Sequence, residues 1–201
     1  MNLGIFGGSF APFHLGHRTA LEEFRSGAEL DRCLVVPSAQ PPHKQKSTLF
    51  SDRQRLDMTR LGTKDLSHTE VWDWEINQGG RSYTVFTLRE CHRRWPSARL
   101  LLYVGSDMLL SIETWYRPEE IFQLAEIVAF SRTGQDRAAL EKHRQQLEAR
   151  FSLHCRILPG TPFPVSSTQI RERLAQGKDI SDLVPEPIDD YLRREGFYGI
   201  R

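Results

Sequence analysis

Short apolar runs alternate with longer amphipathic segments along this chain of 201 residues. The apolar runs are typical of β-strands, and we predict strands over residues 2–6, 33–36, 71–76, 99–104, 126–130 and 154–158. The amphipathic segments predict helices over about 15–27, 52–62, 82–95, 136–150, 167–175 and 186–195. In the helix at 82–95, Ser82 is the predicted cap and Pro96 the stop.

Strands separated by helices predict an α/β fold, because a helical crossover between two strands makes them parallel. We expect a single three-layer domain over residues 1–201, with a mostly parallel sheet and a C-terminal helical segment, 166–198, packed on it. Ligands of such sheets bind beyond the carboxyl ends of the strands. The loops at 7–17, 41–44, 105–115 and 131–134 should therefore meet at one edge, whereas the order of the strands stays open.

Composition narrows the class of protein. A hydrophobic fraction of 39% is enough for the core of one globular domain. The net charge of +1 gives no bulk electrostatic reason to bind nucleic acid or an anionic membrane, and no apolar run has the length of a membrane span. Cys33, Cys91 and Cys155 are odd in number and widely spaced, which favours the reducing cytoplasm over a disulfide framework. The oligomeric state stays open, a homo-oligomer included.

Residues 7–17 read GGSFAPFHLGH and lie between the first predicted strand and the first predicted helix. The adjacent glycines at 7 and 8 would let a triphosphate lie against the main chain. A helix that begins near residues 12–15 would direct its unpaired N–H groups and its positive dipole end at the same place. His14 and His17 share one face of that first turn. Gly16 has no side chain, so a ligand can lie directly on the turn. The segment therefore predicts a phosphate-binding site.

Other interpretations of this segment compete with the phosphate site. Two glycines are common in ordinary strand-to-helix turns. The two histidines could bind a metal, but no Cys, Asp or Glu lies near enough in the sequence to suggest a third ligand. The segment also fits neither the dinucleotide-binding fingerprint G-x-G-x-x-G nor the P-loop pattern.

The whole string resembles the signature G-G-[ST]-F-D-P-x-H-x-G-H of nucleotidyltransferases, which transfer a nucleotidyl group from a nucleoside triphosphate to a phosphate-bearing acceptor. Residues 165–171, VSSTQIR, are similar to a second signature of the family, I-S-[SA]-T-x-I-R. Ser166 or Ser167 can cap a helix whose start would hold phosphate oxygens, and Arg171 supplies a planar charged fork. The resemblance implies a Rossmann-like nucleotidyltransferase fold and an ATP site made of Gly7, Gly8, Ser9, Phe10, His14, Gly16, His17, Gly105, Asp107, Ser167, Thr168 and Arg171.

The middle of the chain resembles one branch of that family, the nicotinate mononucleotide adenylyltransferases of NAD biosynthesis. The branch motifs P-P-H-K, S-Y-T-x-x-T-L, G-x-D and T-W-Y correspond to residues 41–44, 82–88, 105–107 and 114–116. The resemblance implies that Trp115 stacks on the nicotinate ring, that Thr84 and Tyr116 surround its carboxylate through main-chain groups, and that Asp107 meets the adenosine ribose. The acceptor-binding residues it implies are Pro42, His43, Lys44, Thr84, Trp115, Tyr116 and, more weakly because Thr133 replaces the usual proline, Arg132.

Each of these residues also has an ordinary structural explanation. Trp115 could pack in the core, Thr84 could start its helix, and Asp107 could cap the short helix after its strand. Lys44 could be solvated in its polar loop, and Arg171 could lie exposed on an amphipathic helix.

The implied reaction needs no nucleophilic side chain, because the acceptor phosphate is already anionic and can attack the α-phosphorus of ATP directly. Positioning and charge compensation remain for the protein, with His14, His17 and Arg171 as the candidate catalytic residues. The partners are ATP and nicotinate mononucleotide, and Mg²⁺ would enter with the triphosphate, so no metal-binding residues are expected. The product would be nicotinate adenine dinucleotide.

Ala11 departs from the family signature, which has aspartate at this position. If that aspartate only braces the loop, its loss costs about 1 kcal/mol of local order; if it acts in catalysis, this chain is an impaired enzyme or a nucleotide sensor. We favour the bracing role, because a carboxylate there would repel a triphosphate. Related transferases that use nicotinamide mononucleotide or phosphopantetheine remain alternatives. Class I aminoacyl-tRNA synthetases also carry H-x-G-H, but their lysine-rich K-M-S-K-S loop has no counterpart here.

Overall fold

The structure is a computed structural model that describes residues 1–41, 49–131 and 134–199. Its centre is a six-stranded sheet in the order β3-β2-β1-β4-β5-β6, in which every neighbouring pair is parallel. The strands are β1 (Asn2–Gly8), β2 (Arg32–Pro37), β3 (Thr69–Val71), β4 (Arg99–Val104), β5 (Glu126–Ser131) and β6 (Cys155–Pro159). The predicted α/β fold with a mostly parallel sheet is confirmed.

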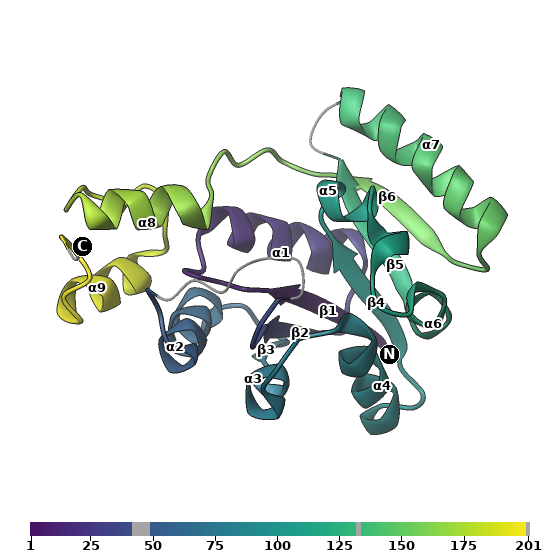
Figure 1. The fold of residues 1–201 in the computed structure, drawn as a ribbon, viewed down its shortest axis with the longest axis horizontal. Helices are drawn as coiled ribbons and strands as arrows, with labels where there is room; N and C mark the ends of the chain where they lie inside the picture. Colours follow the sequence, from purple (N-terminus) through teal and green to yellow (C-terminus); the bar gives the residue numbers. More distant parts are fainter. Residues whose placement is uncertain (42–48, 132–133, 200–201) are drawn as a thin grey trace.

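Helices cover both faces of the sheet, and α8 and α9 lie at one end of the molecule with α7 at the other (Figure 1). The helices among the described residues are α1 (Leu15–Gly27), α2 (Asp52–Thr63), α3 (Trp74–Gln78), α4 (Thr84–Arg94), α5 (Ser106–Leu109), the 3₁₀ turn η1 (Ile112–Thr114), α6 (Pro118–Leu124), α7 (Gly134–Arg150), α8 (Ser167–Ala175) and α9 (Glu186–Arg194). Within these residues, no helix combines the length and the apolar character that crossing a bilayer requires.

The strands are apolar on both sides because each face of the sheet has its own core. Leu3 and Ile5 of β1 belong to a cluster that includes buried residues of α4, α6 and α7. Phe6 belongs to a second cluster, formed with residues of α1, α2, α8 and α9. Alternate residues of one strand thus enter different cores, which explains why β1, β2 and β4 read as nearly continuous apolar runs.

The predicted strand at 71–76 is wrong after its first residue, because β3 spans Thr69–Val71. β3 ends at Val71, the N–H of Trp72 donates one further bond to the Val35 carbonyl at 2.8 Å, and α3 begins at Trp74. The rings of Trp72 and Trp74 nevertheless lie together, with centroids 5.7 Å apart. The period-two pattern of the two tryptophans was therefore a packing signal across a strand-to-helix junction, and the sequence did not distinguish it from a longer strand.

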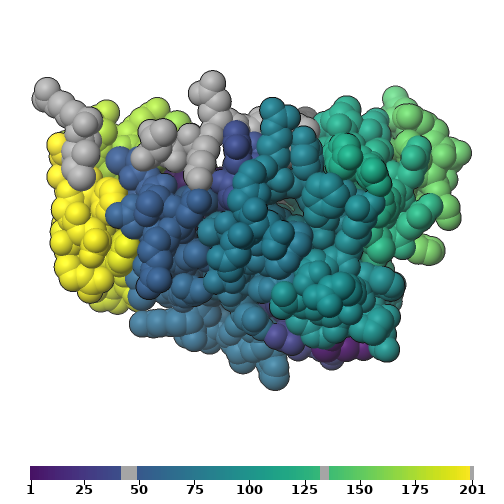
Figure 2. Space-filling model, turned by 60° about the horizontal axis from the view of Figure 1, so that its bottom comes forward, coloured from purple at the N-terminus to yellow at the C-terminus, as the bar shows by residue number. Residues whose placement is uncertain are grey.

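The C-terminal helices are part of the same core as the segment that follows β1. Ile170 of α8 and Ile188 of α9 are fully buried in the cluster that also contains Phe13. A Cβ on Gly62 of α2 would lie 2.5 Å from the Phe13 ring and 3.1 Å from Ile188, so the absence of a side chain here lets three segments meet. Figure 2 shows the yellow C-terminal residues against the blue segment that contains α2.

Candidate active site

A cavity of about 650 Å³ opens at the carboxyl ends of the strands. It lies where the strand order reverses, between β1 and β4, which is the place where open α/β sheets bind ligands. Its volume is in the range of small-molecule sites. The predicted site residues that line it are Gly7, Gly8, Ser9, His14, Gly16, His17, Thr84, Gly105, Asp107, Trp115, Tyr116, Ser167, Thr168 and Arg171.

The two glycines after the first apolar run are the last residues of β1 and form no turn of their own. Gly7 is exposed, and a Cβ there would meet nothing within 4 Å, which fits the expected close approach of a ligand. At Gly8 the reason is different, because a Cβ would lie 2.6 Å from the Phe10 ring. The left-handed backbone of this loop is found at Phe10, with φ of 45°.

Phe10 does not line the cavity, contrary to its predicted place in the ATP site. Its side chain is fully buried, with its ring centroid 5.9 Å from that of Phe6 and 5.0 Å from that of His17. This packing holds a left-handed conformation that a bulky residue rarely adopts. The contribution of Phe10 is therefore to support the His17 ring from the core side.

His14 and His17 cap the start of α1 for each other. His14 is the N-cap residue, and its Nδ1 accepts the N–H of His17 at 3.2 Å, while Nδ1 of His17 accepts the N–H of His14 at 3.3 Å. The two rings stack with centroids 3.6 Å apart. A nitrogen that accepts a hydrogen bond carries no proton, so this capping requires the tautomer with the proton on Nε2 in both rings. The pair therefore offers two Nε2–H donors from one helix start.

Burial lowers the pKa of His14 from its ordinary value of 6.5 to about 4. The imidazole is consequently neutral at pH 7 and keeps its accepting nitrogen in the cap. Protonation would convert Nδ1 into a donor that faces another donor, and it would place a positive charge against the stacked His17 ring. The site is thus built for neutral hydrogen-bond donation by His14.

Gly16 serves a purpose other than the one we expected. A Cβ there would lie 2.9 Å from Cγ1 of Val165 and 3.2 Å from the His14 ring. The space above this glycine is therefore occupied by the chain that leads into α8, although the residue also borders the cavity. Gly16 allows the two phosphate motifs to approach each other.

The start of α8 is hydrogen-bonded to the loop before α1. Ser166 caps the helix by accepting the N–H of Gln169. Ser167 Oγ donates to the Pro12 carbonyl at 3.2 Å, and Arg171 Nη1 donates to the Ala11 carbonyl at 2.8 Å. We call residues 7–17 together with 166–171 the phosphate side of the cavity.

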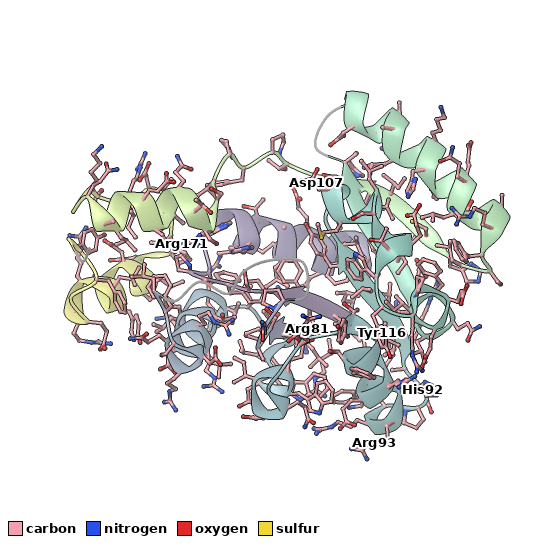
Figure 3. The ribbon with its side chains drawn as sticks, in the orientation of Figure 1. Arg81, His92, Arg93, Asp107, Tyr116 and Arg171 are labelled. Carbon is pink, nitrogen blue, oxygen red and sulfur yellow. The ribbon has the colours of Figure 1, made fainter. Side chains whose placement is uncertain are left out.

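Arg171 is half-buried, and desolvation lowers the pKa of its guanidinium, which stays cationic at pH 7. Its Nη2 donates to Thr168 Oγ1 at 3.0 Å. Arg171 and Asp107 lie at separate places around the strand ends in Figure 3, and the labelled His92 and Arg93 lie away from them on α4. The structure thus gives the predicted phosphate side a fixed cation next to a helix start.

Thr84, Trp115 and Tyr116 form what we call the acceptor side. Thr84 is the first residue of α4, where N–H groups have no partner within the helix. Trp115 is half-buried between the cavity and the core cluster of α4 and α6. Tyr116 is 44% exposed, with its ring centroid 4.7 Å from that of Tyr83. A planar ring beside a helix start suits an aromatic acceptor with an anionic substituent.

The predicted cap of α4 is wrong. Tyr83, and not Ser82, is the N-cap residue of α4, and Ser82 Oγ accepts the N–H of Ala39 at 2.8 Å. The N-cap residue of α5 is Gly105, so the alternative explanation of Asp107 as the cap of this helix does not hold. Asp107 is an exposed residue of the first turn that lines the cavity, and its ribose contact stays a prediction.

Some predicted site residues cannot be placed. Pro42, His43, Lys44 and Arg132 lie outside the described residues. Within the part of the chain that the structure describes, no group of three His, Cys, Asp or Glu side chains could hold a metal ion.

The sequence analysis missed two charged residues that line the cavity. Arg55 of α2 is 2% exposed, and Glu75 of α3 is half-buried, with desolvation raising the pKa of its carboxyl. Glu75 accepts a hydrogen bond from the hydroxyl of Thr87. Arg55 could have been recognised, because it occupies the buried stripe of α2 together with Thr59 and Gly62. Glu75 carried no such signal, since its segment had been predicted to be a strand.

Comparison with known proteins defines the class. The family model described as cytidylyltransferase-like matches residues 5–173. The structure of Plasmodium falciparum nicotinic acid mononucleotide adenylyltransferase in complex with NaAD superimposes with a TM-score of 0.78, at 19% identity, over 100% of this chain and 98% of that one. The family match and the shared fold place this chain in the class of nucleotidyltransferases.

Curated relatives narrow the class to one family. The probable nicotinate-nucleotide adenylyltransferase of Moorella thermoacetica is 36% identical, with 98% of this chain and 91% of the relative covered. The one of Desulfatibacillum aliphaticivorans is 34% identical, with 98% and 100% covered. This chain belongs to the nicotinate-nucleotide adenylyltransferase family.

Proposed function

We propose that this chain transfers the adenylyl group of ATP to nicotinate mononucleotide, forming nicotinate adenine dinucleotide and pyrophosphate. The observation that carries the proposal is the phosphate side: two histidines fixed as Nε2–H donors lie beside the α8 start that holds Arg171. The family membership supplies the acceptor, and the aromatic acceptor side supports it. The buried free cysteines are compatible with a reducing compartment such as the cytoplasm.

The histidine pair would act where negative charge develops. As the acceptor phosphate attacks the α-phosphorus and pyrophosphate departs, charge spreads over the α-phosphate and the bridging oxygen. Nε2–H groups of His14 and His17 would donate to these oxygens, and their fixed orientation means that no ring needs to turn during the reaction. Neither histidine needs to accept a proton from the acceptor, since a phosphate is already anionic.

The start of α8 would hold the leaving pyrophosphate. N–H groups and hydroxyls of Ser167 and Thr168, with the guanidinium of Arg171, form a donor set suited to the β- and γ-phosphates. A divalent metal accompanies the triphosphate in this class of enzyme, and we propose that it is Mg²⁺, entering as part of the Mg·ATP substrate with water as most of its ligands. Its charge would neutralise phosphate oxygens that the protein donors do not reach.

On the acceptor side, Trp115 would stack on the nicotinate ring. The N–H of Thr84, at the start of α4, would donate to the ring carboxylate, and the main chain of Tyr116 would also contact it. An N–H donor favours a carboxylate over the neutral carboxamide, because hydrogen bonds to charged acceptors are stronger. The acid mononucleotide is therefore the expected substrate.

Pyrophosphate release from ATP tests the proposal, with nicotinate mononucleotide, nicotinamide mononucleotide and phosphopantetheine offered as acceptors in parallel. We expect rapid release with the first acceptor and a clearly lower kcat/KM with the second. Release that is fastest with another acceptor would reassign the acceptor side. ATP binding without release with any acceptor would show a nucleotide-binding protein without transferase activity.

A further inference from the structure

Arg55 of α2 lies under the cavity floor, at the point where the pairing of β1 and β2 ends. The two strands pair as far as Gly8 and Pro37, and the N–H of Ser38 adds a last bond to the Gly8 carbonyl at 2.9 Å. Beyond this point the strands separate into the phosphate loop and the loop that leads to the acceptor side. The next carbonyl groups, those of Ser9 and Ser38, therefore lie beyond the last backbone hydrogen bond between the two strands.

Arg55 binds both of these carbonyl groups. Its Nη1 donates to the Ser9 carbonyl and its Nη2 to the Ser38 carbonyl, each at 2.6 Å. Nη2 also contacts Asp52 Oδ1 at 2.6 Å, which provides a counter-charge one turn earlier in α2. A planar guanidinium can bridge two carbonyl groups in this way, whereas an ammonium group on a flexible stem cannot hold the same fixed spacing. Arg55 thus replaces the missing sheet bonds with a rigid link.

The link continues from the second loop to the acceptor side. Ser82 Oγ accepts the N–H of Ala39 at 2.8 Å, and the N–H of Ser82 donates to the Gln40 carbonyl at 2.9 Å. Ser82 lies two residues before Thr84, where α4 begins. A continuous set of contacts therefore joins the phosphate loop, the loop after β2 and the start of α4.

Two polar atoms of this floor point to a role toward the cavity. Among the described residues, Arg55 Nε and Ser38 Oγ are buried and have no hydrogen-bond partner. Both residues line the cavity, and Arg55 is 2% exposed. A buried arginine with an unsatisfied N–H costs stability, and here that cost falls on a side chain that lines the cavity and binds both loops at its edge.

We propose that Arg55 is a positioning residue that sets the distance between the phosphate side, through Ser9, and the acceptor side, through Ser38 and the contacts that lead to Ser82. The inference rests on the proposed function, because it assigns ATP to the phosphate side and the acceptor to the acceptor side. Arg55 touches neither reacting phosphate; it acts through Ser9 and Ser38. Its loss should leave each substrate with its own binding groups and should misplace the two reacting atoms relative to each other. Small misplacements of this kind have large effects on rate.

The test separates binding from turnover in an Arg55→Lys variant, which keeps the charge beside Asp52. We expect kcat to fall by about 30-fold or more, because a misplacement near 1 Å can cost on the order of a hundredfold. The Kd for ATP alone, measured by calorimetry, should stay within about threefold, since the phosphate side keeps its donors. The matched control is Arg60→Lys on the same helix, an exposed arginine paired with Asp57 and Asp73, which should change neither quantity.

Other outcomes are equally decisive. A kcat within about threefold of wild type would overturn the proposal. A parallel loss of ATP affinity and of folded protein, with normal turnover per folded molecule, would show a merely structural arginine. Wild-type chain that releases no pyrophosphate with nicotinate mononucleotide would contradict the proposed function instead, independently of Arg55.

A second variant keeps the idea testable if Arg55→Lys does not fold. Ser82→Ala removes the next contact of the same set without leaving a buried charge. We expect the KM for nicotinate mononucleotide to rise about fivefold while the Kd for ATP stays unchanged, because the contacts of the Ser82 hydroxyl with the Ala39 N–H and the Glu75 carboxyl are lost on the acceptor side only. An unchanged KM would contradict the continuity of the contacts.

Discussion

The histidine end of the cavity belongs to the core, whereas the tyrosine end of the acceptor side lies near the surface. His14 is 5% exposed, is held in a mutual helix cap and stacks on the His17 ring, while Tyr116 is 44% exposed. Arg171 and Trp115, on the two sides, are both half-buried. Side chains in a close-packed core have few alternative positions, and surface side chains have many. We therefore expect the position of His14 to be rigid, and we expect the Tyr116 end of the acceptor side to tolerate substitutions at a low cost in stability.

The largest effect is expected at the phosphate side. His17→Ala should lower kcat by about a hundredfold to a thousandfold, the cost of one fixed donor to a developing negative charge. Pyrophosphate release at saturating substrates measures it. His92→Ala, an exposed histidine on α4, is the control and should keep normal turnover. Near-normal turnover of folded His17→Ala would show that the pair does not stabilise the transition state.

The second prediction concerns stability and pH. The folded pKa of His14, about 4, lies below its ordinary value of 6.5, so the unfolded chain takes up the proton first as the pH falls. The contribution of His14 to the free energy of unfolding should therefore be fully present above pH 6.5. It should decline as the pH falls from 6.5 to 4, by up to roughly 3 kcal/mol.

Asparagine caps helices well and does not titrate in this range, so His14→Asn should remove this part of the decline. Urea unfolding of His14→Asn and of the control His92→Asn at a series of pH values measures the difference. Identical pH dependence in both variants would mean that His14 is not the neutral buried group described above.

The third prediction addresses the acceptor side. Trp115→Leu should raise the KM for nicotinate mononucleotide by about tenfold to a hundredfold, the usual contribution of an aromatic platform to a stacked ring. The KM for ATP should stay constant, because the phosphate side is separate. Trp95→Leu is the control, since Trp95 packs against the same core cluster outside the cavity. Equal changes in both KM values would contradict the assignment of Trp115 to the acceptor and not to ATP.

The smallest effect is expected at Ala11. The main-chain carbonyl of this residue already holds Arg171, so Ala11→Asp should change kcat by less than about tenfold. The same pyrophosphate assay measures this change, with thermal unfolding as the check on folding. A large increase in kcat would mean that the natural chain is impaired and that the phosphate side is incomplete without a carboxylate.

Much of the fold followed from the sequence, because the parallel strands are buried on both faces and their apolar runs are hard to mistake. The strand-to-helix change at Trp72 could not be predicted, since two stacked tryptophans give the same spacing as an alternating strand. The crowding of Phe10 over Gly8 and of Val165 over Gly16 depends on contacts between distant segments, which no local pattern reveals.

Part of the cavity lining could be predicted from the motifs, whereas its geometry, the burial of Phe10 and the presence of Arg55 and Glu75 could not. The motifs placed His14, His17 and Arg171 together, and the structure brings all three to one cavity. That both imidazoles cap a helix depends on ring rotation: the His17 ring packs against Phe10 and Phe13, and the His14 ring stacks on His17. Arg55 lay outside every motif, and only its place in a buried helical stripe marked it.

The mutual histidine cap determines when the two N–H donors become oriented. Orienting dipoles toward a growing charge is costly in water, where the solvent must rearrange during each reaction. In this protein the same backbone bonds that start α1 also decide which nitrogen of each ring carries the proton. The reorganisation is therefore completed once, as the chain folds, and no catalytic cycle has to repeat it.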